Sequence, residues 1–138
     1  ILIVIGIIAI LASIVVVAIN PARQFAQARN TQRTSNVETI LNAIGQNLAD
    51  NKGVFTCPSI GTTINNTANN IGTAGGLVNL SCLVPVYVTQ IPFDPNGGDD
   101  VDTKYTIKVD PIVGRYTVCA PQGAEPSIAG SMSICLTR

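Results

Sequence analysis

Apolar residues occupy almost every position at the start of the chain. The segment Ile1–Ile19 reads ILIVIGIIAILASIVVVAI and contains no charge and one polar side chain, Ser13. At the α-helical rise of about 1.5 Å per residue, a helix of this length nearly spans the hydrocarbon core of a bilayer. A small soluble domain can hardly cover a helix that is apolar on every face. The pattern therefore predicts a helix that lies in a membrane or among other such helices.

The next segment keeps a helical pattern but becomes amphipathic. From Pro21 to about Asp50, arginines and glutamines dominate the early turns, and apolar residues then recur three or four positions apart. This apolar stripe comprises Val37, Ile40, Leu41, Ile44 and Leu48. The sequence DNKG, which ends at Gly53, is typical of a helix stop. The first 50 residues are therefore predicted to form one very long helix with an amphipathic second half.

The pair Asn20-Pro21 stands where the two halves of this helix meet. A proline removes one backbone donor and clashes with the carbonyl four residues back, here that of Val17. The helical pattern resumes at once, whereas a simple membrane anchor would be followed by a linker. We therefore predict a kink or unwound stretch within about Val15–Asn20, which would act as a flexible joint.

Short strands and loops are predicted for the remainder of the chain. Residues 59–76 are rich in Asn, Thr and Gly and read as a surface loop, and Pro85 limits any strand around it to an edge or a break. Two alternating runs around Asp110–Gly114 predict a β-hairpin, and residues 131–138 could add a last strand. The predicted fold class is α+β, a long helix on a small antiparallel sheet. Its parts are residues 1–20, 21–52 and a globular head of 53–138.

The composition narrows the class of function. The chain has 138 residues, with eight basic and eight acidic side chains, so no global charge draws it to nucleic acid. It contains no histidine, which excludes Ser-His and Cys-His nucleophile pairs and histidine-ligated metals. Mean hydropathy is +0.38, which is high for a soluble domain, and the apolar segment Ile1–Ile19 accounts for most of the difference. We expect no enzymatic activity, and the sequence gives no strong evidence for direct binding of nucleic acid.

Four cysteines are predicted to form two disulfides. Cys57, Cys82, Cys119 and Cys135 contain no Cys-x-x-Cys pair, and an even number in a short extracytoplasmic chain favours disulfides. Three pairings are possible. We favour Cys57–Cys82 and Cys119–Cys135 because each pair closes a loop that is local in sequence.

Two further sets of residues are candidates for contacts between molecules. Gly6, Ala9 and Ser13 share one face of the first helix, and small residues of this kind allow close helix packing in lipid. We interpret this face as a polymerisation seam. Arg23, Arg29 and Arg33 are spread over three turns, which supports a contact with acidic groups of a neighbouring subunit better than nucleic-acid binding.

An acidic turn is the only candidate metal site. Asp94, Asp99, Asp100 and Asp102 lie on a Gly-rich stretch, and hard oxygen ligands of this kind suit calcium. Their spacing does not match an EF-hand loop, and a solvated turn is the alternative. Calcium is therefore the one possible cofactor, and no other is expected.

The opening stretch ILIVIGIIAILASIVVVAINPARQFAQARNTQR resembles the N-terminal helix of type IV pilins and the related pseudopilins of type II secretion. Beyond it, the loop, the IPFDP stretch before the hairpin and the C-terminal cysteine pair resemble the family in architecture. The resemblance implies a major pilin that polymerises through its N-terminal helix into an extracellular filament. It also implies inner-membrane assembly machinery as a partner, and residence in the inner-membrane bilayer before assembly.

The chain departs from the family at its start. A mature pilin usually opens with a methylated Phe and reaches a Glu a few residues later, and on this alignment that Glu would immediately precede Ile1. The arginines after Ile19 would place that side in the cytoplasm, unless a basic leader stood upstream, as expected of a pilin precursor. Two alternatives stay open: a pseudopilin or minor pilin of a secretion or DNA-uptake machine, and a single-pass anchored extracellular binding module.

Overall fold

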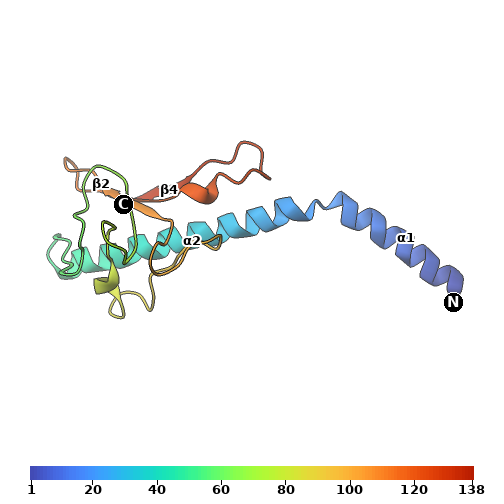
Figure 1. Ribbon diagram of the computed structural model, residues 1–138, viewed down its shortest axis with the longest axis horizontal. Coiled ribbons are helices and arrows are strands. Elements are labelled where there is room, and N and C mark those ends of the chain that lie inside the picture. The colour runs from blue at the N-terminus through green and yellow to red at the C-terminus, as the bar shows by residue number, and fades with distance from the viewer.

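The computed structural model describes residues 1–138 and consists of a bent helical spine with a head at one end (Figure 1). The spine contains helices α1 (Leu2–Ala18) and α2 (Pro21–Asp50). Short elements build the head: strands β1 (Asn69–Asn70), β2 (Thr106–Val109), β3 (Tyr116–Ala120) and β4 (Ile134–Thr137), and the 3₁₀ turns η1 (Ser81–Leu83) and η2 (Pro121–Gly123). The predicted α+β class is confirmed, and the arrangement is consistent with a pilin-like fold.

The spine bends where the sequence predicts a kink. The axes of α1 and α2 meet at 52°, and the two residues between the helices are Ile19 and Asn20. Asn20 adopts a left-handed conformation with φ of 46°, and its side-chain oxygen accepts a hydrogen bond from the backbone N–H of Arg23. Asn20 is thus the N-cap of α2 and Pro21 its first residue, the position where the missing N–H costs least. The predicted bend is confirmed, but the prediction of one continuous helix is wrong: α1 ends at Ala18 and a second helix starts at Pro21, because Asn20 caps a new helix and Pro21 opens it.

The four strands form one antiparallel sheet in the order β1-β2-β3-β4. The predicted hairpin joins β2 to β3 with Val109 opposite Tyr116, and the chain end forms β4 beside β3. The sheet lies along α2 (Figure 1). The stretch around Pro85, where an edge strand or a break was possible, forms η1 and turns instead of a strand. The expected loop of residues 59–76 is irregular except for the two residues of β1.

The hydrophobic core lies between α2, the sheet and the long loop. Val37, Ile40, Leu41 and Ile44 of the predicted stripe are buried, and Leu48 is partly buried. Ile107 and Val118 face them from the sheet. The loop of residues 59–76 adds Ile64 and Ile71, and the apolar stretch after it adds Val78, Leu80 and Leu83. Two isolated apolar residues of an otherwise polar loop are therefore part of the core.

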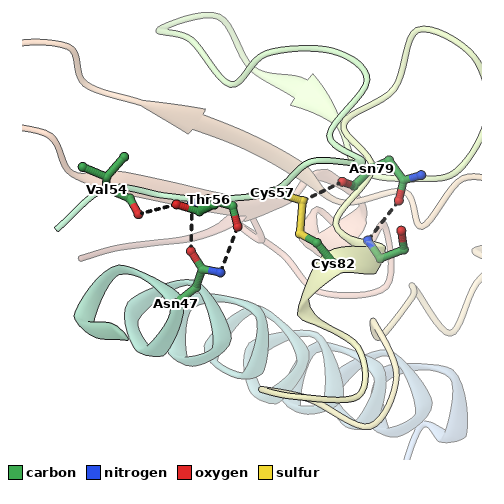
Figure 2. Close-up of a disulfide and its surroundings, with 7 residues drawn as sticks. Asn47, Val54, Thr56, Cys57, Asn79 and Cys82 are labelled. Atoms are coloured by element: carbon green, nitrogen blue, oxygen red, sulfur yellow. Dashed lines mark hydrogen bonds between the residues drawn. A yellow bond between two sulfur atoms is a disulfide. The ribbon is translucent and has the colours of Figure 1, made fainter. Parts of the chain in front are cut away.

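Two disulfides fasten the head, in the pairing that the sequence favoured. Cys57–Cys82 ties the segment after α2 to η1, and Cys119–Cys135 joins β3 to β4. Next to the first bridge, Asn47 of α2 donates to the carbonyl of Thr56 at 3.0 Å and accepts from its N–H at 2.9 Å (Figure 2). The chain is thus clamped to the helix one residue before Cys57.

Replacing Ile40 by Ala tests the assignment of the core. The side chain is fully buried, so its truncation should lower the free energy of unfolding of the head by about 2–5 kcal/mol. Urea unfolding in mild detergent, followed by tyrosine fluorescence, measures the change. Glu38→Ala, on the exposed face of the same helix, is the control and should change stability by no more than about 0.5 kcal/mol. Equal effects would mean that the core lies elsewhere.

Candidate assembly surface and buried charge network

The surface of α1 is apolar and none of it is covered by the head. No residue of the helix is buried. The exposed fractions of the large apolar side chains between Ile1 and Ile19 run from 45% to 97%. Figure 1 shows why: α1 projects away from the head, beyond the bend. Because α1 cannot be kept dry by its own chain, this surface is the strongest candidate for contact with lipid or with another protein.

One face of α1 offers room for close approach. A Cβ atom placed on Gly6 would meet no other atom within 4 Å. The hydroxyl of Ser13 donates to the carbonyl of Ile10 at 2.8 Å, so it is satisfied inside its own helix. Gly6, Ala9 and Ser13 thus present a surface of small groups without an unpaired side-chain donor. The role of this face as a seam stays a prediction.

The bend creates a small apolar hollow. Val16, Ile19, Pro21, Gln24 and Phe25 line a space of about 160 Å³ at the joint. Phe25 is 67% exposed although it lies beyond the continuous apolar run. The apolar surface of the spine therefore continues through the joint onto the first turns of α2.

Neither helix alone has both the length and the hydropathy of a membrane span. The bent pair of α1 and α2, taken together, has the length and composition of a broken span. Helix α1 has 17 residues, and at about 1.5 Å per residue it falls a little short of a bilayer core of about 30 Å.

A group of four charges, of which all but Arg29 are buried, joins the middle of α2 to two parts of the head. Arg33 is fully buried, and its guanidinium donates to both oxygens of Asp94, at 2.7 Å and 3.0 Å. Its remaining nitrogen donates to Glu125 at 2.5 Å and to Asn30 at 2.8 Å. Arg29 completes the group with two bonds to Glu125, at 2.8 Å and 2.9 Å. Two cations and two anions balance, and planar two-point pairs of this kind are the strong ones.

This network corrects the predicted role of the arginines. Arg33 is inside the head and is not available to a neighbouring subunit, and the guanidinium of Arg29 is held by Glu125 of the same chain. Arg23 is exposed and makes no salt bridge, and the side chain of Arg29 is 35% exposed, so a subunit contact remains a prediction for these two residues. Sequence reasoning missed Glu125 and Asn30, because 92 positions separate Glu125 from Arg33 and no local pattern links them.

The four aspartates of the proposed calcium site are not brought together. Asp94 is 1% exposed and committed to Arg33, and Asp102 pairs with Lys104 at 2.7 Å. The carboxylate of Asp99 accepts the N–H groups of Val101 and Asp102, within its own turn. No three acidic, cysteine or histidine side chains converge on a point that a metal could occupy. The residues do not fit a calcium ion, and the calcium prediction is corrected to a hydrogen-bonded turn.

Comparisons of the chain with protein-family models, with curated proteins and with solved structures found no match.

The network predicts how the head responds to acid. Hydrogen bonds from Arg29 and then from Arg33 lower the pKa of Glu125 from 4.5 to about 2. A carboxyl group whose pKa is lower in the folded state contributes stability above its unfolded pKa, and that stability is lost as pH falls toward the folded value. The contribution of Glu125 should therefore be complete above about pH 4.5 and disappear on the way down to about pH 2.

Thermal unfolding in detergent, measured across this pH range, tests the expectation with Glu125→Gln. The variant should be less stable at neutral pH, and its melting temperature should fall less steeply below about pH 4.5 than that of the parent. Glu38→Gln removes an exposed carboxyl group and should leave the slope unchanged. If both variants follow the parent curve, the network does not govern acid stability.

Proposed function

We propose that this protein is a structural subunit that polymerises through its N-terminal helix into an extracellular filament of the type IV pilus kind. The observation that carries the proposal is the uncovered surface of the spine, since all fourteen large apolar side chains from Ile1 to Ile19 are exposed. At about 1.5–3 kcal/mol for each such side chain, leaving this surface in water would cost tens of kcal/mol. Only lipid or other helices of the same kind relieve that cost.

Two successive environments account for the design of the spine. Before assembly, the apolar part of the bent pair α1–α2 lies in the inner membrane, with the disulfide-bonded head outside the cytoplasm. After assembly, the same surface packs against copies of itself in the filament core. The joint at Asn20-Pro21 supports this change because it lets α1 change its angle to α2 without disturbing the head. Inner-membrane assembly machinery would move the subunit from one environment to the other.

The small-residue face supplies a reason for helices to associate after they are already in lipid. Apolar burial gives no net drive there, whereas close approach of backbones at small residues does. The open space at Gly6 permits that approach. A contact between different surfaces of successive copies does not close on itself, and its repetition generates a filament.

Two other functions would follow from the same anchor. A pseudopilin or minor pilin would assemble only into short structures in a secretion or DNA-uptake machine. An anchored extracellular binding module would stay monomeric in detergent. The small-residue face and the 30-residue second helix favour polymerisation over the binding module, since an anchor alone requires neither.

Electron microscopy of sheared cell-surface material is the test, combined with two matched substitutions in α1. The parent chain should be found in ordered filaments. Gly6→Leu keeps the helix apolar but blocks close approach, so it should reduce filament yield, whereas Val4→Leu adds a leucine away from the small face and should not. Both variants should retain the disulfides and melting behaviour of the head.

The possible outcomes separate the two parts of the proposal. Monodisperse monomer for the parent chain would overturn the assignment as a filament subunit. Filaments of equal yield from the parent and both variants would keep that assignment and remove the seam.

A further inference from the structure

The turn that follows Asp94 contains the dipeptide Asn96-Gly97, which is the one asparagine–glycine pair in the chain. Asn96 is exposed, and its side chain makes no hydrogen bond. Gly97 has a φ of 80°, and its N–H takes part in no backbone hydrogen bond. An unrestrained carboxamide therefore lies next to an unengaged backbone nitrogen that no side chain shields.

We propose that Asn96-Gly97 is a site of self-modification, at which the carboxamide of Asn96 is lost through a cyclic imide. In this reaction the nitrogen of Gly97 loses its proton and forms a bond to Cγ of Asn96. The bond from Cγ to Nδ2 breaks, and the nitrogen leaves as ammonia. Water then adds to either carbonyl of the five-membered ring and opens it to an aspartate or to a β-linked aspartate. No oxidation or reduction occurs, and water is the only co-reactant.

Glycine is required here for a steric reason. A side chain on the residue that supplies the nitrogen would crowd the approach to Cγ, and glycine has none. The positive φ of Gly97 is a conformation that other residues adopt only with strain. The fold thus keeps the least hindered nucleophile beside an exposed carboxamide.

Other asparagines in the head provide internal controls. The side-chain oxygen of Asn65 accepts the N–H of Thr67 at 2.8 Å, and that of Asn79 accepts the N–H of Ser81 at 2.9 Å. Each is followed by a residue with a side chain, Asn66 or Leu80. Both features oppose ring closure, so Asn65 and Asn79 should react far more slowly than Asn96.

The product would act on the buried charge network. The N–H of Asn96 donates to the carboxylate of Asp94 at 2.8 Å, and the N–H of Gly98 donates to the carbonyl of Asp94 at 3.1 Å. A Cβ atom on Gly98 would lie 2.5 Å from the backbone nitrogen of Asp94, so this turn has no slack. A β-linkage inserts one more backbone atom between Asn96 and Gly97. The turn then cannot keep both bonds, and Asp94 is held less firmly against Arg33.

The experiment is a timed incubation of the full chain in detergent micelles at mildly alkaline pH, followed by digestion and tandem mass spectrometry. The peptide that contains Asn96 should gain the mass that corresponds to exchange of ammonia for water. Fragment ions should place the change at residue 96, and the rate should rise with pH. Asn96→Gln, whose amide carbon lies one bond further from the backbone, should stay unchanged.

Two results would overturn the site. One is retention of the Asn96 carboxamide in the folded chain, whatever the unfolded chain does under the same conditions. The other is loss at Asn65 and Asn79 at the same rate as at Asn96.

The consequence for the network is tested separately, by chromatographic isolation of the β-linked form. Its melting temperature should be lower than that of the Asn96→Asp variant, which has the same charge and a normal backbone. Equal melting temperatures would show that the turn tolerates the extra atom, and would overturn this second part alone.

Discussion

The structure depends on a surface that the protein cannot cover. The head places its apolar residues between α2, the sheet and the long loop, and it leaves nothing over to shield α1. Any stable state of the chain must therefore supply an apolar partner from outside, and the cost of failing to do so far exceeds the usual stability of a domain of this size, about 5–15 kcal/mol. Polymerisation is one way to meet that requirement in the absence of lipid.

The head, by contrast, is self-contained. One disulfide ties the segment after α2 to η1, and the other joins β3 to β4. The group of Arg29, Arg33, Asp94 and Glu125 fixes α2 to two loops that are distant in sequence. Ion pairs of this kind add little net stability, because burying the charges removes them from water at a large desolvation cost. They do set position: each guanidinium has its geometry fixed by two-point pairs, and no buried side-chain polar atom is left without a partner. The consequence is a head whose internal contacts do not involve α1.

The sequence predicted those parts that local pattern controls. Periodicity located α2 and its buried stripe, Asn20-Pro21 located the joint, and the hairpin around Asp110–Gly114 followed from alternation and turn residues. The disulfide pairing followed from loop length. What local pattern did not reveal was long-range: Arg33 reads as one of three similar surface cations until Glu125 and Asp94 close around it. The calcium prediction for the acidic turn failed for the same reason. The aspartates are close in sequence, but their carboxylates form hydrogen bonds with different partners. The long polar loop also hid Ile64 and Ile71, because isolated apolar residues in a loop carry no period.

The central claim is that the surface of α1 is buried by α1 of other copies. Helical reconstruction of filaments purified from the cell surface, by electron cryomicroscopy, tests it most directly. We predict that residues 1–17 of neighbouring copies lie together at the filament axis, with their large apolar side chains in contact and the heads on the outside. Filaments in which α1 lies at the periphery, or cell-surface material in which this chain is present only as separate monomers, would contradict it.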